Sequence, residues 1–142
     1  TDKSITFYFG DLDENPKADL IRAAHEQCIA LEKMTAELLR PGAVPAEIYE
    51  KILAAVDPAF RDGFMNSCKF LGHSIGLTMD EAPVLAKGFN DPVVPGMTFA
   101  VEPKIALEGI GLIGTENTYE VTEDSAAKSL TGDCETGLEI NY

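Results

Sequence analysis

The spacing of apolar residues changes once along this chain, after Phe64. Before that point, apolar residues recur three or four positions apart over residues 20–38 and again over residues 45–56, as on a helix with one buried face. After Phe64, short apolar segments alternate with polar residues, and this alternation is the period of a β-strand. The sequence therefore predicts two amphipathic helices followed by a group of strands.

Turn-forming residues separate the predicted strands from one another. Gly, Pro, Asn or Asp bounds each strand, as is usual in antiparallel sheets. The predicted strands cover residues 3–9, 69–77, 97–101, 112–121 and 128–131. No linker rich in glycine and serine and no internal repeat interrupts the 142 residues. We therefore expect a single α+β domain over residues 1–142, with two helices packed on a curved antiparallel sheet.

Charge and cysteine content limit the partners and the compartment of the protein. The formal net charge of −13 argues against nucleic acid and against an anionic membrane surface as partners, because both attract cationic proteins. No apolar run approaches the roughly 20 residues that a membrane span needs. The three cysteines form no CxxC pair, which is typical of a reducing compartment, and a cytoplasmic location is expected.

Three acidic residues, Asp2, Glu102 and Glu116, lie on predicted strands beside small or polar side chains. A carboxylate that is half-buried on a sheet must be compensated by a cation or by hydrogen-bond donors. His73 lies in another predicted strand and offers a nitrogen. One histidine with several carboxylates is a ligand set for Mn, Co, Fe or Zn, and surplus carboxylates suggest that two ions are bridged. Paired ions produce hydroxide from water and polarise a carbonyl group.

Each of these residues also has a structural interpretation that the sequence leaves open. His73 can be a buried core histidine, Glu116 can pair with a lysine, and Glu102 can end a strand. Asp2 lies near a chain end and can be disordered, whereas Asp80 can be a turn residue. The choice depends on whether the fold brings these side chains together.

Several short motifs follow one another in a fixed order along the second half of the chain. They read GHSIGL, MDEAP, PGMTFAVEP, GTENTYEVTED and SLT. This order resembles the C-terminal half of the pita-bread metallopeptidases, a family that includes Xaa-Pro dipeptidase, Xaa-Pro aminopeptidase, methionine aminopeptidase and creatinase. The opening TDKSITFYFG is similar to another strand of that family, so the resemblance covers nearly the whole chain.

The resemblance implies a pita-bread fold and a metal-dependent exopeptidase of the Xaa-Pro type, which cleaves short peptides with two divalent ions. The implied metal ligands are Asp2, His73, Glu102 and Glu116. Catalytic roles are implied for His73, for Glu102 as the group that moves a proton to the leaving nitrogen, and for Asp80. The position of Asp80 is that of an active-site histidine in the HEPP motif of the family, and Gly114 replaces the arginine of the RIED motif.

Two departures from the family pattern keep other functions open. The family's first metal-binding aspartate and first active-site histidine precede the matched region. We therefore expect the chain to be a C-terminal fragment, with the N-terminal half of the same protein as its missing partner. The fragment by itself should be inactive, and the ions can be absent from it. Its exposed sheet edge can pair with a second copy to form a homo-oligomer. Asp80 and Gly114 favour a non-catalytic pita-bread module that binds peptides or a protein. Creatinase-like hydrolysis of a small molecule without metal is the third alternative.

Overall fold

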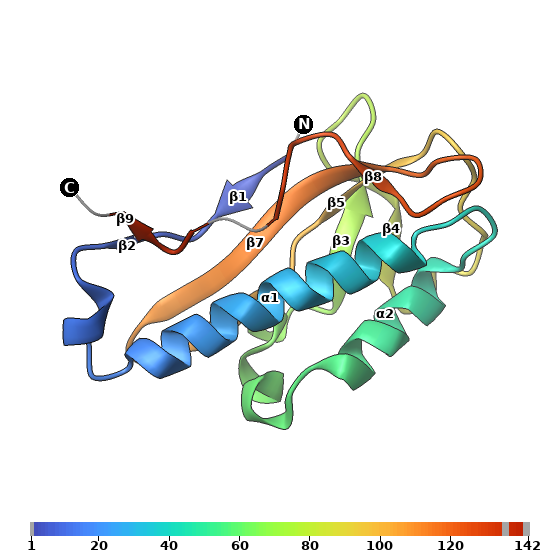
Figure 1. The fold of residues 1–142 in the computed structure, drawn as a ribbon. Coiled ribbons are helices and arrows are strands. Elements are labelled where there is room, and N and C mark those ends of the chain that lie inside the picture. The colour runs from blue at the N-terminus through green and yellow to red at the C-terminus, as the bar shows by residue number, and fades with distance from the viewer. Residues whose placement is uncertain (1, 135–136, 141–142) are drawn as a thin grey trace.

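The computed structural model describes residues 2–134 and 137–140. Its two helices are α1 (Ala18–Leu38) and α2 (Pro45–Ala55), and three short 3-10 helices cover Leu12–Glu14, Pro58–Gly63 and Met65–Ser67. The strands are β1 (Ser4–Ile5), β2 (Tyr8–Phe9), β3 (Phe70–Ser74), β4 (Glu81–Ala86), β5 (Thr98–Val101), β6 (Lys104–Leu107), β7 (Gly111–Glu120), β8 (Lys128–Ser129) and β9 (Glu139–Ile140). Both helices pack on a mostly antiparallel sheet (Figure 1), so the predicted α+β class is confirmed.

Both predicted helices are present, and each buries its apolar face. In α1 the buried side chains include Ile21, Cys28 and Leu31, at the spacing that turns one helix face toward β7. Pro45 occupies the first turn of α2, where its missing N–H leaves no hydrogen bond unmade. No helix among the described residues has the length and apolar character needed to cross a membrane.

The long strand β7 organises the sheet. The strand order is β1-β7-β5-β3-β4, and β6 and β8 also pair with β7. All of these pairs are antiparallel, whereas the separate pair of β2 and β9 is parallel. Figure 1 shows β7 running the length of the sheet, with α1 lying along it. One strand therefore links the chain start, the centre of the sheet and the helix layer.

The strands β4 and β6 were not predicted from the sequence, and their prolines explain why. Pro83 lies within β4 and Pro103 directly precedes β6, and a proline removes a hydrogen-bond donor from a strand. β4 tolerates its proline because it is the last strand in the sheet order, with one edge unpaired within that order. The segments around these two prolines therefore lack the usual sequence signals of strands.

The predicted strand over residues 3–9 was wrong in its continuity. β1 pairs with β7, but β2 pairs with β9, and the chain between them belongs to neither strand. The apolar side chains of this segment, Ile5, Phe7 and Phe9, are 46%, 55% and 73% exposed. The alternation of apolar and polar residues was read correctly, but no layer covers the apolar face within the described residues.

The packing of β3 against β5 leaves no room for a side chain at Gly72. A Cβ atom built there would lie 2.1 Å from the carbonyl oxygen of Ala100. We expect Gly72→Ala to lower the free energy of unfolding by about 1–3 kcal/mol, because the two strands must separate. Urea denaturation of the full-length protein measures the change.

Gly137→Ala is the matched control for this substitution. A Cβ atom at Gly137 has no neighbour within 4 Å, so its free energy of unfolding should change by less than about 0.5 kcal/mol. Equal effects of the two substitutions would contradict the close approach of β3 and β5.

Candidate metal centre

The strand register places the predicted ligands on one face of the sheet. His73 of β3 lies opposite Ala100 of β5, and Ala100 lies opposite Thr118 of β7. Cross-strand partners share a face, and so do residues two positions apart in one strand. Glu102 follows Ala100 by two positions, and Glu116 precedes Thr118 by two. His73, Glu102 and Glu116 therefore point to the same side, with the small Ala100 between them.

The start of the chain adds Asp2 to this face. Ser4 lies opposite Glu116 in the pairing of β1 with β7, and Asp2 precedes Ser4 by two positions. The Asp2 N–H donates to Thr118 Oγ1 over 2.9 Å, and Thr118 Oγ1 donates to the Asp2 carbonyl oxygen over 2.8 Å. The backbone of Asp2 is therefore paired with β7 in this structure.

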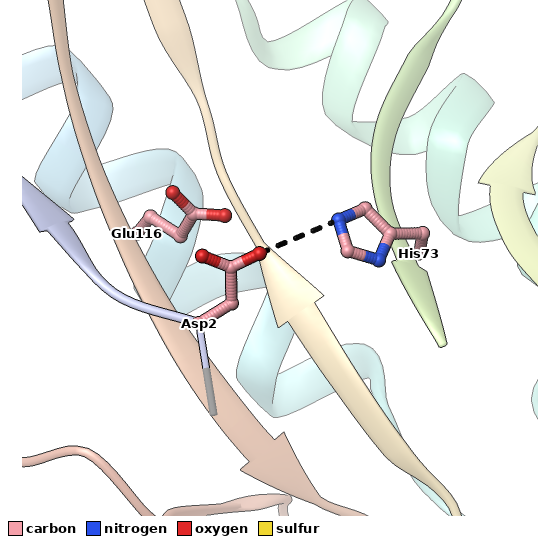
Figure 2. A group of neighbouring side chains, drawn as sticks. All are labelled: Asp2, His73 and Glu116. Atoms are coloured by element: carbon pink, nitrogen blue, oxygen red, sulfur yellow. Dashed lines mark ion pairs between the residues drawn. The ribbon is translucent and has the colours of Figure 1, made fainter. Parts of the chain in front are cut away.

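The four side chains converge on one space. Asp2, His73 and Glu116 each offer a ligand atom, and these atoms all lie within 4.8 Å of one another (Figure 2). His73 Nε2 lies 3.9 Å from Asp2 Oδ2 and 3.5 Å from Glu102 Oε1. Two ligands held about 2.1 Å from one ion lie roughly 3.0 to 4.2 Å apart. The distances from His73 Nε2 to Asp2 and Glu102 lie within this range, as expected for ligands of a single divalent ion.

The ring of His73 is oriented for such a role. Its Nδ1 lies 3.2 Å from the carbonyl oxygen of Ser74, which only accepts hydrogen bonds, so Nδ1 carries the hydrogen. In the neutral ring this leaves the lone pair on Nε2, the atom that faces the carboxylates. A backbone carbonyl thus fixes which nitrogen is available as a ligand.

Asp80 reaches the same nitrogen from outside the sheet. It lies in the turn before β4, and its Oδ1 is 3.1 Å from His73 Nε2. Its side chain is 73% exposed, whereas the side chains of His73 and Glu102 are buried. Asp80 therefore stands at the solvent-exposed side of the cluster.

Within the cluster, the fold raises the pKa of the Glu116 carboxylate. Burial raises its pKa, the hydrogen bond from Ser4 and the charge of Lys104 lower it, and the charges of Glu102 and Asp2 raise it again, with a net increase. Ser4 Oγ donates to Glu116 Oε2 over 2.6 Å. The site therefore holds this carboxylate at an energetic cost, which a bound cation would offset.

The sequence analysis missed Lys104 as part of the cluster. Its Nζ donates to Glu102 Oε2 and lies 3.8 Å from Glu116 Oε2, so it is the lysine partner that the sequence allowed for Glu116. Burial lowers the pKa of Lys104, but Glu102, Glu116 and Asp2 raise it by more. Its position two residues after Glu102 was a usable signal, which Pro103 obscured.

A further buried carboxylate contacts β7 from the opposite face. Glu32 of α1 is fully buried, and its Oε1 accepts hydrogen bonds from Asn117 Nδ2 and Tyr119 OH, both over 2.7 Å. Asn117 and Tyr119 alternate with Glu116 and Thr118, so they point toward the helix layer. The sequence analysis did not predict this network, because its partners are 85 and 87 positions from Glu32.

Comparisons with known proteins agree with this arrangement. The profile of Metallopeptidase family M24 matches residues 1–123. The chain is 30% identical over 132 residues to a "Probable dipeptidase PepE" of Mycobacterium bovis, covering 89% of the chain and 32% of that protein. It is 26% identical over 127 residues to the Xaa-Pro dipeptidase of Lactobacillus delbrueckii, covering 87% of the chain and 32% of that protein.

A solved structure also resembles the fold. The X-Pro aminopeptidase of Thermotoga maritima superposes with a TM-score of 0.84 at 20% identity, over 99% of this chain and 38% of that one. The chain thus spans about a third of the length of the curated relatives it matches.

The raised pKa of Glu116 predicts a pH dependence of stability. Above its ordinary value of 4.5, the folded protein holds a proton that the unfolded chain releases. The free energy of unfolding should therefore fall as the pH rises through the interval between the unfolded and folded pKa values. Urea denaturation at a series of pH values, with a chelator present, measures this slope.

Two substitutions test whether Glu116 causes the slope. Glu116→Gln should make it shallower, because the titrating group is gone. Ser4→Ala should make it steeper, because Ser4 donates to the ionised carboxylate and lowers its pKa. Identical slopes in all three proteins would show that Glu116 ionises as freely in the folded state as in the unfolded one.

Proposed function

This chain belongs to Metallopeptidase family M24, and from that premise we propose that its protein is a metal-dependent exopeptidase acting on short peptides with proline after the scissile bond. The predicted pita-bread fold is confirmed by the solved relatives. The Xaa-Pro preference is supported by similarity to proteins described as Xaa-Pro dipeptidases. The proposal concerns the whole protein, because this chain matches only about a third of the length of its relatives.

One observation carries the proposal: separate segments of the chain bring carboxylates to His73 Nε2. The nearest oxygens of Glu102 and Asp2 lie 3.5 Å and 3.9 Å away. Asp2, His73, Glu102 and Glu116 are the residues that would hold a divalent ion. A bound ion of this kind lowers the pKa of water and polarises the scissile carbonyl.

The protein residues have separate tasks in the proposed reaction. His73 presents Nε2, because Ser74 holds its Nδ1–H. Glu102 is buried and its Oε1 faces the same space, so it accepts a proton from the attacking water and passes it to the leaving nitrogen. Asp80 is exposed at the open side, where its carboxylate orients the substrate.

Other parts of the prediction belong to this proposal. The two divalent ions expected from the sequence remain a prediction, and a second ion would need a further ligand from a part of the catalytic domain outside this chain. We propose that this part supplies the rest of the substrate cleft. The choice among Mn, Co, Fe and Zn, a cytoplasmic location and pairing as a homo-oligomer remain predictions. Cys28, Cys68 and Cys134 are free thiols, which is compatible with a reducing compartment.

A second candidate function is favoured by a specific observation. The ammonium group of Lys104 already neutralises part of the charge of Glu102 and Glu116. With less negative charge to compensate, the cluster could persist in a peptide-binding module that has no catalytic ion. Metal content and turnover distinguish this module from the exopeptidase.

The removal of one proposed ligand tests the function. In the full-length protein, Glu116→Ala should lower both bound metal and hydrolysis of a Xaa-Pro dipeptide by at least about a hundredfold, because Glu116 is a direct ligand in the proposal. Elemental analysis and a peptidase assay on the same samples measure both quantities. Glu123→Ala, an exposed carboxylate outside the cluster, is the control and should change neither. A folded wild-type protein without metal and without turnover would overturn the proposal.

The role of Asp80 requires a different readout. We expect Asp80→Asn to lower kcat by about a hundredfold while the metal content stays unchanged, because the amide cannot accept a proton or match the charge. Asp91→Asn, in an exposed turn, is the control. Loss of metal in Asp80→Asn would instead identify Asp80 as a ligand, and unchanged kinetics would remove it from the site.

A further inference from the structure

A cation of the protein itself already lies inside the carboxylate cluster. Lys104 Nζ donates to Glu102 Oε2 and is 3.8 Å from Glu116 Oε2. The side chains of these carboxylates are only 10% and 7% exposed, so the ammonium group compensates charges that water barely reaches. Lys104 is therefore unlike a surface lysine, which contributes little to its partner.

The fold makes specific room for this lysine. Lys104 of β6 lies opposite Gly114 of β7. A Cβ atom at Gly114 would lie 2.5 Å from Lys104 Cγ and 2.8 Å from the carbonyl oxygen of Pro103. The Lys104 side chain thus occupies the space that a side chain at position 114 would fill. Across this space its Nζ reaches Glu102 and Glu116.

The remaining ligand atoms form a group of their own. Asp2, His73 and Glu116 have ligand atoms within 4.8 Å of one another, and Glu102 approaches His73 Nε2 through its Oε1 at 3.5 Å. Glu102 is also the residue to which Lys104 donates its hydrogen bond. The cluster therefore divides into a side for one ion and a side occupied by the ammonium group.

The charges agree with this division. Asp2, Glu102 and Glu116, the carboxylates on the sheet face, carry three negative charges when ionised. Asp80 adds a fourth charge, but its side chain is 73% exposed, so water screens it. One divalent ion and one ammonium group supply three positive charges, whereas two divalent ions with Lys104 supply five. Cations held within a few ångströms of one another repel strongly in a poorly solvated site.

We propose that Lys104 is a built-in cation that takes the place of the second divalent ion, so that the site holds one ion among Asp2, His73, Glu116 and the Oε1 side of Glu102. The inference rests on the proposed function in that the site must bind metal. It assigns Lys104 as a positioning residue, which holds Glu102 by its Oε2 and leaves Oε1 facing His73.

Metal stoichiometry tests this inference without any measurement of activity. The full-length protein, first stripped with chelator, is titrated with Mn²⁺ in a calorimeter, and bound metal is then counted by elemental analysis. Wild type should bind about one equivalent and Lys104→Met about two, because the ammonium group no longer repels the second ion. The second ion should bind Lys104→Met at least about tenfold more tightly than wild type.

Three further variants make the result specific. Lys104→Arg keeps the positive charge and should behave as wild type. Lys51→Met carries the same substitution on the exposed side of α2 and should also behave as wild type. Lys104→Gln replaces Lys104→Met if the latter fails to fold by circular dichroism, because its amide can still donate to Glu102.

The outcomes separate this inference from the proposed function. One ion in the wild type and two in Lys104→Met support the inference. Two ions in both wild type and Lys104→Met overturn the inference and leave the metallopeptidase proposal intact. No metal in the wild type overturns the proposed function, and no metal in either protein overturns both.

Discussion

The register of β7 is the constraint on which the rest of this structure depends. It pairs with β1, β5, β6 and β8, so it fixes the chain start and the centre of the sheet at once. Its side chains alternate between Glu116 on the site face and Asn117 on the helix face. A shift of one residue would move Glu116 under α1 and Asn117 into the site. The hydrogen bonds of Glu32 to Asn117 and Tyr119 secure the correct register from behind.

The site brings several carboxylates close together, and this lowers the stability of the fold. Buried carboxylates on a sheet lower stability unless donors or cations reach them. Ser4 and Lys104 reach Glu116, Lys104 reaches Glu102, and the backbone of Asp2 is tied to β7. A cluster held in this way is a candidate functional site, because stability alone would favour apolar residues. In a member of a metallopeptidase family, the natural use of such a cluster is to bind a cation.

Much of the fold could be predicted because the signals for it are local. Helical spacing gave α1 and α2, and alternation gave β3, β5, β7 and β8 with only their ends displaced. β4 and β6 could not be predicted in the same way, since Pro83 and Pro103 remove the ordinary strand signal. The segment at residues 3–9 shows the opposite failure. Its alternation is clear, but only the positions of β7 and β9 divide it into two strands.

The sequence by itself determined which side chains are available for a metal site and which face of its strand each one occupies. Alternation places Asp2 with Ser4, Glu102 with Ala100 and Glu116 with Thr118, and this follows from backbone geometry alone. Only the tertiary structure decided that these faces coincide, because cross-strand neighbours such as Ser4 and Glu116 are 112 positions apart. It also decided that Lys104 enters the cluster over Gly114, since that contact depends on a strand pairing no local pattern specifies. Side-chain direction is a property of one strand, whereas the composition of the site is a property of the register between strands.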